Sequence, residues 1–159
     1  AETISLLSTI AHRAAEKAVD LILLPEGFIG GYPLGNSFGS YVGGRSDLGR
    51  EEFATYFQSA VDLGDTVGNG AGAGDQWLRR QLDVPEGQKQ RGDGTREELE
   101  EIARKSGVFI VTGCIERAGG SLYCAVVYVC PRLGVIGKRR KVMPVRRFHF
   151  DYVVSGIMS

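Results

Sequence analysis

Residues 20–33 read DLILLPEGFIGGYP, and this stretch predicts a strand that ends in a constrained, acidic turn. The four aliphatic residues 21–24 show no polar alternation, which is typical of a strand covered on both faces. Pro25 ends the strand because it has no amide proton to donate to a sheet. Glu26 is therefore expected just beyond the strand's end.

A carboxylate at that place can serve an α/β protein as a general base. The strand would fix its backbone, and apolar neighbours would raise the pKa of Glu26 toward neutrality. The glycines at 27, 30 and 31 let the following backbone turn sharply or approach a ligand closely. A capping or ion-paired glutamate in an ordinary loop is the alternative interpretation of the same residues.

Three helices are expected around this strand. Apolar residues spaced three and four apart predict an amphipathic helix over residues 3–19, with His12 on its solvent side. A second helix is predicted over residues 51–61, with Phe53, Tyr56 and Phe57 turned toward the core. Thr95 and Glu98 form a capping-box pattern for a third helix, which Gly107 would end.

The last third of the chain has the pattern of an antiparallel meander. Strands are predicted over residues 108–114, 122–130 and 135–138, with turns at 118–121 and 131–134. A glycine-rich stretch at about 64–94 precedes them, and its length and composition indicate a surface insertion. Helices packed on a sheet, a layered α/β fold, follow from this order of elements.

Composition excludes several classes of function. The 19 basic residues balance the 19 acidic ones, so the net charge favours neither nucleic acid nor a membrane surface as a partner. No apolar run is long enough to span a membrane, and no signal peptide is visible. The number and spacing of the three cysteines fit neither a disulfide framework nor a zinc site, so a reducing, cytoplasmic location is expected.

Two motifs give the chain a family resemblance. Residues 25–33, PEGFIGGYP, resemble the first signature of the nitrilase branch of the carbon-nitrogen hydrolases, and residues 137–144, GKRRKVMP, resemble the second. The family's fold is a four-layer αββα sandwich. Because the family's opening strand and the region after the second motif are missing, the resemblance implies a single incomplete domain over residues 1–159, with sequence expected before Ala1.

The resemblance also implies a chemistry, the hydrolysis of a small nitrile to a carboxylic acid and ammonia without a cofactor or metal. Glu26 occupies the position of the family's glutamate base, and Lys141 that of the lysine that stabilises charge on the nitrile nitrogen. The alternative for the basic run that contains Lys141 is a solvated face or a nuclear-localisation signal.

The nucleophile is the difficulty, because the family places its cysteine in a third motif downstream of the lysine. Residues 142–159 contain no cysteine, and Cys114, Cys124 and Cys130 have the pattern of core thiols. We therefore expect a nitrilase-type chain that is inactive as it stands.

Two other functions stay open. One is an amidase or cyanide-hydrating relative, and the other is a non-catalytic subunit that binds a full-length homologue. The family forms dimers and spirals, so a homo-oligomer is also expected. Half of a two-sheet sandwich would leave an apolar sheet face uncovered.

Overall fold

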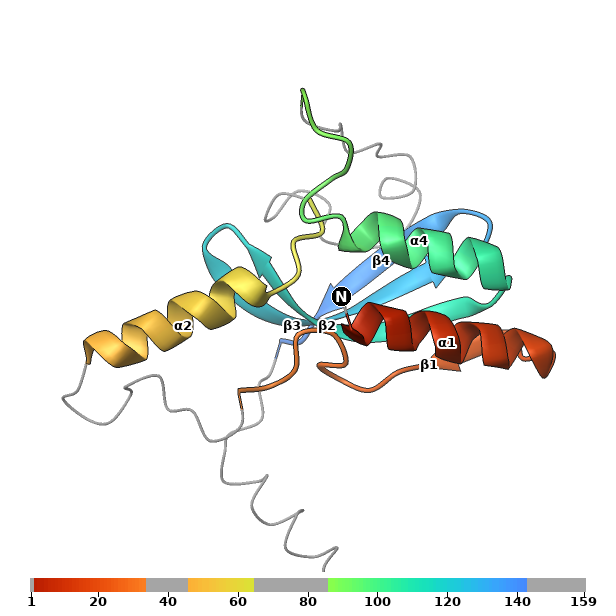
Figure 1. Cartoon of the computed structure of the whole chain (residues 1–159), viewed down its shortest axis with the longest axis horizontal. Helices are drawn as coiled ribbons and strands as arrows, with labels where there is room; N and C mark the ends of the chain where they lie inside the picture. Colours follow the sequence, from red (N-terminus) through yellow and green to blue (C-terminus); the bar gives the residue numbers. More distant parts are fainter. Residues whose placement is uncertain (1, 34–45, 65–85, 143–159) are drawn as a thin grey trace, which may run out of the picture.

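The computed structural model describes residues 2–33, 46–64 and 86–142 of the chain (Figure 1). Within them the elements follow in the order α1 (Glu2–Glu16), β1 (Leu21–Leu23), α2 (Asp47–Ser59), α4 (Thr95–Ser106), β2 (Phe109–Ala118), β3 (Ser121–Cys130) and β4 (Gly134–Arg140). The strands form one sheet in the order β1-β2-β3-β4, in which β1 runs parallel to β2 and the later pairs are antiparallel. The predicted α/β fold and the meander are confirmed.

Helices α1 and α4 lie side by side over one face of this sheet (Figure 1). Their apolar sides meet the sheet in a single core cluster, which includes Leu7, Ala11, Leu99, Ala103, Ile110, Val127 and Val129. Removing apolar surface from water contributes about 25 cal/mol per Å², so this contact is the main stabilising layer. One helix layer on one sheet corresponds to half of an αββα sandwich.

Strand β1 is the first correction to the sequence prediction, because it is not covered on both faces. Leu21 is 51% exposed and Leu23 is 73% exposed, whereas Ile22 between them packs against the core. Within the described residues the strand pairs with β2 alone, and the helices cover one side of the sheet. An unbroken aliphatic run predicted two apolar neighbours, and the described residues supply one.

Helix α2 is the second correction. It begins at Asp47, four residues earlier than predicted, and Ser46 accepts a hydrogen bond from the amide of Gly49 at its start. Phe53 is 44% exposed, and its ring lies near that of Phe57 on the same helix. Tyr56 ties the helix to the site region, since its hydroxyl donates to the carbonyl of Gly31 at 2.9 Å.

The helix boundaries also differ where the backbone departs from helical geometry. Helix α1 ends at Glu16 rather than at residue 19, because Ala18 adopts a left-handed conformation with φ of 53°. His12 is exposed, as predicted. Gly107 ends α4 as predicted, with φ of 72° and its amide donating to Ala103.

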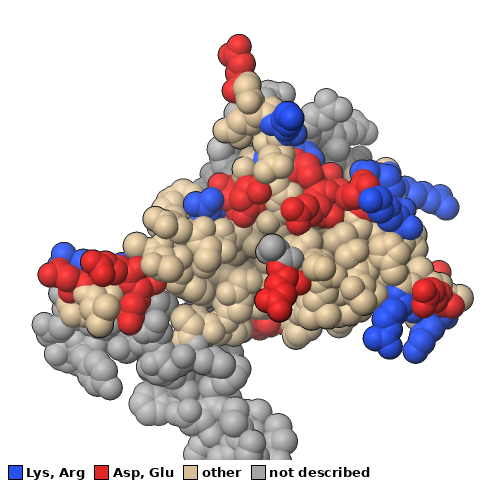
Figure 2. All heavy atoms as spheres, viewed as in Figure 1, with Lys and Arg blue, Asp and Glu red and all other residues tan. Residues whose placement is uncertain are grey.

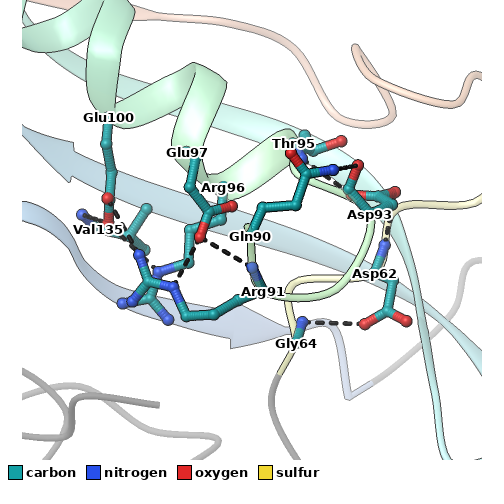
Figure 3. Close-up of polar contacts among 10 residues, drawn as sticks. All are labelled: Asp62, Gly64, Gln90, Arg91, Asp93, Thr95, Arg96, Glu97, Glu100 and Val135. Atoms are coloured by element: carbon teal, nitrogen blue, oxygen red, sulfur yellow. Dashed lines mark hydrogen bonds and ion pairs between the residues drawn. The ribbon is translucent and has the colours of Figure 1, made fainter. Parts of the chain in front are cut away.

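The predicted capping box of α4 is wrong. Thr95 is already inside the helix, Gly94 occupies the cap position, and Gly94 has no side chain to cap with. Asp93 takes over the function, because one of its carboxylate oxygens accepts from the amide of Thr95 at 2.9 Å (Figure 3). Acidic side chains gather over the start of α4 and basic ones over its end, which suits the helix dipole (Figure 2).

The two ends of the glycine-rich stretch are held together. Asp93 accepts a second hydrogen bond from the amide of Asp62 at 3.0 Å, and the carbonyl of Asp62 accepts from the amide of Asp93 (Figure 3). Arg91 pairs with Glu97 and Glu100 on α4, and Glu100 in turn accepts from the amide of Val135 on β4. The boundaries of the predicted insertion are therefore anchored; its interior, residues 65–85, lies outside the described residues.

Replacing Asp93 by alanine should lower the free energy of unfolding by about 1 kcal/mol, because the amides of Thr95 and Asp62 both lose their acceptor. Thr95→Ala is the matched control and should cost much less, since its side chain makes no cap hydrogen bond. Urea unfolding followed by circular dichroism measures both variants. A larger loss of stability for Thr95→Ala than for Asp93→Ala would support the capping box that the sequence predicted.

Candidate functional site

The acidic turn after β1 lies directly on strand β2. The amide of Leu24 donates to the carbonyl of Val111 at 2.8 Å, and the amide of Ile29 donates to the carbonyl of Gly113 at 3.1 Å. A Cβ atom at Gly113 would lie 2.4 Å from the carbonyl oxygen of Pro25. Glycine at this position is therefore required for the close approach that fixes the backbone of Glu26.

Glycines shape the turn itself, as predicted. Gly27, Gly30 and Gly31 all have positive φ, which side-chain-bearing residues rarely adopt. A Cβ atom at Gly27 would also lie 3.0 Å from the ring of Tyr32. The turn thus folds Tyr32 back over Gly27, and its hydroxyl donates to Oε1 of Glu26.

Lysine 141 approaches the same place from the end of β4. Its amide donates to the carbonyl of Cys124 at 2.8 Å, which continues the β3–β4 ladder one residue past the strand. Side chains alternate between the faces of a strand, so Lys141 lies on the face opposite to Lys138 and Arg140. The basic run is therefore divided: Lys138 is fully buried, and Lys141 faces the turn.

The structure brings Glu26 and Lys141 together. The amine Nζ of Lys141 lies 2.8 Å from Oε1 and 3.0 Å from Oε2 of Glu26, although the two residues are 115 positions apart. The side chain of Glu26 is 48% exposed, and that of Lys141 is 32% exposed. Both residues that the sequence motifs single out thus share one site.

Two further side chains belong to this cluster, and sequence reasoning missed them. The hydroxyl of Tyr32 bonds to Glu26 and lies 3.2 Å from Sγ of Cys124 on β3. Tyr32 stands in the first motif, so its place there was a usable signal. Cys124 was interpreted as a core thiol, because nothing local indicates that β3 passes under the acidic turn.

The pKa of Glu26 is a correction, since it is lowered to about 2 and not raised toward neutrality. The hydrogen bond from Lys141 is the main cause and that from Tyr32 the second, and together they outweigh the opposing effect of burial. The same hydrogen bond raises the pKa of Lys141. The site therefore holds a carboxylate and an ammonium ion at neutral pH.

None of these contacts creates a thiolate. Burial raises the pKa of the Cys124 thiol above its usual range, and burial raises that of Cys114 to about 12. A protonated thiol is a poor nucleophile.

A cavity of about 680 Å³ lies beside the cluster, on the sheet face that the helices leave open. Its walls include Leu23, Glu26, Cys124, Val126, Arg139 and Lys141. In the described ranges, no three His, Cys, Asp or Glu side chains are grouped so that they could hold a metal ion. None of the helices described has the length and apolar character needed to cross a membrane.

Tyr32→Phe should raise the pKa of Glu26 above about 2 while leaving it below its ordinary value of 4.5, because the hydrogen bond from Lys141 remains. The carboxyl carbon resonance of Glu26, followed by NMR through an acid titration, measures the change. Tyr56→Phe is the matched control: its hydroxyl bonds to Gly31 in the same turn but not to Glu26. An unchanged pKa in Tyr32→Phe would show that the tyrosine does not hold the carboxylate.

Comparison with known proteins now identifies the family. The model of the carbon-nitrogen hydrolase family matches residues 1–157. The chain is 36% identical to a nitrilase of Bradyrhizobium diazoefficiens over 86% of its length, and 37% identical to an aliphatic nitrilase of Sinorhizobium fredii over 90%. It is 38% identical to nitrilase 1 of Arabidopsis thaliana over 82%.

These matches cover 34%, 36% and 30% of the three relatives, so the chain spans about a third of their length. The match to the family model, however, takes in nearly every residue of the chain. It includes both motifs and the two charged residues that meet in the site. This chain belongs to the carbon-nitrogen hydrolase family.

Proposed function

We propose that Glu26 and Lys141 are the base and the cation of a site that hydrolyses a small nitrile to a carboxylic acid and ammonia. The observation that carries the proposal is their pairing at 2.8 and 3.0 Å from opposite ends of the described chain. The nitrilases among its relatives support the substrate class.

Each residue has a chemical task in this reaction. A carboxylate that stays ionised at neutral pH can take the proton of a thiol held against it, which leaves a thiolate to attack the nitrile carbon. Negative charge then grows on the nitrile nitrogen, and the ammonium of Lys141 stabilises it. The nitrogen takes up a proton to give a thioimidate, a first water adds to its carbon, and ammonia leaves, which gives a thioester. A second water then releases the carboxylic acid and restores the thiol.

Among the described residues the cluster contains the thiol of Cys124, whose pKa is raised chiefly by burial. The family resemblance places the nucleophile downstream of the lysine instead, and residues 142–159 contain no cysteine. We therefore propose that the 159-residue chain does not turn over by itself. The pair would serve a cysteine supplied by the region that follows the second motif in the relatives.

Ammonia release tests this proposal in a hybrid protein. In the hybrid, residues 2–142 replace the matching segment of the Bradyrhizobium relative, which supplies the rest of the sequence. The hybrid should release ammonia from simple aliphatic or aromatic nitriles, and the 159-residue chain should not. Release of ammonia from amides but not nitriles would favour an amidase instead, and activity of the short chain without its three cysteines would refute the thiol mechanism.

A second function, binding to a full-length homologue as a non-catalytic subunit, is favoured by one observation. The exposed leucines of β1, Leu21 and Leu23, lie on an apolar sheet face that the described residues leave open. Apolar surface of this kind is typical of a contact face. Co-expression with an intact relative followed by size-exclusion chromatography tests it, and failure of the two chains to co-elute would eliminate the idea.

A further inference from the structure

Glu116 on β2 is a fully buried carboxylate that the proposed reaction does not use. It accepts hydrogen bonds from Nε and Nη2 of Arg140, both at 2.8 Å, and from Nζ of Lys138, which is itself fully buried. The guanidinium of Arg140 also lies 4.0 Å from the ring centre of Tyr123. Both cations come from β4, so one carboxylate holds the end of that strand.

The two parallel hydrogen bonds between Arg140 and Glu116 fix the orientation of the guanidinium as well as pairing its charge. A guanidinium that forms two parallel bonds to a carboxylate has its plane and direction set, whereas a lysine amine is a point charge. The aromatic ring of Tyr123 on β3 restricts the guanidinium further. The guanidinium of Arg140 is therefore held by side chains of β2 and β3, while its backbone pairs with Ala125 in the β3–β4 ladder.

Lys141 is the next residue, and its own amide is held by the carbonyl of Cys124 at 2.8 Å. With both backbone positions fixed, the Lys141 side chain leaves the strand on the opposite face, toward Glu26. The exposed amine of a lysine has many rotamers, and ordering it carries an entropic cost. A fixed backbone limits the places that the amine can reach.

We propose that Glu116, through its paired hydrogen bonds to Arg140, is a positioning residue that holds the amine of Lys141 against Glu26. The interpretation of Lys141 as the cation of the reaction rests on the proposed function. The positional claim does not, because it concerns the Glu26–Lys141 pair in the 159-residue chain itself. A purely structural Glu116 would affect stability and leave that pair unchanged in the folded protein.

Two variants that each remove one cation from Glu116 separate these roles. Arg140→Met leaves a buried Glu116–Lys138 pair, and Lys138→Met leaves a buried Glu116–Arg140 pair. Both variants lose one positive charge beside the same carboxylate, but only Arg140→Met loses the paired bonds next to Lys141. The measurement is the pKa of Glu26 by carbon NMR in the full 159-residue chain.

Arg140→Met should raise the pKa of Glu26 by about one unit, because the carboxylate loses a fixed ammonium neighbour. Lys138→Met should leave the pKa where it is in the unaltered chain. If Arg140→Met does not fold, Arg140→Lys serves as the test variant, since it keeps the positive charge and loses the paired hydrogen bonds to Glu116. The pKa of Glu26 should rise in this variant too.

A pKa that is equally low in the unaltered chain and in the folded Arg140 variants would overturn the inference. An equal rise in Lys138→Met would also overturn it, because charge alone would then be the cause. An ordinary pKa in the unaltered chain would mean that the Glu26–Lys141 pair does not exist in solution. That last result removes the proposed function, whereas the first two leave it standing.

Discussion

Glu116→Ala is expected to lower the free energy of unfolding by about 3–5 kcal/mol, because it removes the buried carboxylate that Lys138 and Arg140 both contact. Lys138 is fully buried, and the side chain of Arg140 is only 14% exposed. Because Lys138 has no access to water and Arg140 has little, most of the desolvation cost of both charges stays while their attraction to this carboxylate is lost. Chemical denaturation of the chain measures the difference.

Glu101→Ala is the matched control, because Glu101 also pairs with two cations, Arg104 and Lys105. That carboxylate is 47% exposed, and exposed ion pairs contribute about 0.2–1 kcal/mol. The two glutamates thus differ in burial and not in the number of partners. Equal losses in the two variants would show that burial of Glu116 carries no special cost.

The same carboxylate should shape the response of stability to acid. Burial by itself raises the pKa of Glu116, but hydrogen bonds from Arg140 and Lys138 hold it below its ordinary value of 4.5. Its stabilising contribution is therefore complete above pH 4.5 and is lost as the pH falls through the folded-state pKa. The difference in stability between the unaltered chain and Glu116→Gln should narrow below that pH, and a constant difference would contradict this.

The basic run at 138–141 shows what sequence could and could not provide. The alternation of its side chains between the two faces of the sheet can be predicted from sequence, because successive side chains of a strand point to opposite faces. What the run could not reveal is that Lys138 and Arg140 both contact Glu116 on β2, since that contact depends on the register of β2, β3 and β4. Glu116 itself, a lone acid in an apolar strand, was a signal that the sequence interpretation did not use.

The acidic turn shows the same division between local and distant causes. The end of the strand before Pro25 and the sharp glycine turn after it follow from residue chemistry, and both were predicted. The direction of the pKa shift of Glu26 was not predicted, because it depends on the amine of Lys141 at the end of β4. The prediction that β1 is covered on both faces failed for a related reason. An aliphatic run indicates apolar surroundings but does not identify the element that supplies them.

Removing either member of the site pair should abolish most of the activity of the hybrid enzyme described above. Glu26→Gln would take away the proposed base and should lower kcat/KM by about 10²–10⁴-fold. Lys141→Met would remove the cation proposed to stabilise charge on the nitrogen and should lower kcat/KM by about 10²–10³-fold. Initial rates of ammonia release at low nitrile concentration give both values.

The double variant distinguishes a working pair from two unrelated residues. Groups that act as a unit in one transition state are strongly non-additive, so Glu26→Gln with Lys141→Met should lose little more than the worse single variant. The exposed pair of Glu101 and Lys105, joined at 3.1 Å on α4, supplies the control, since the same substitutions there remove an ion pair far from the cavity. Losses that multiply in the site pair would mean that Glu26 and Lys141 act independently, and losses that match those of the α4 pair would mean that their contact is an ordinary surface salt bridge.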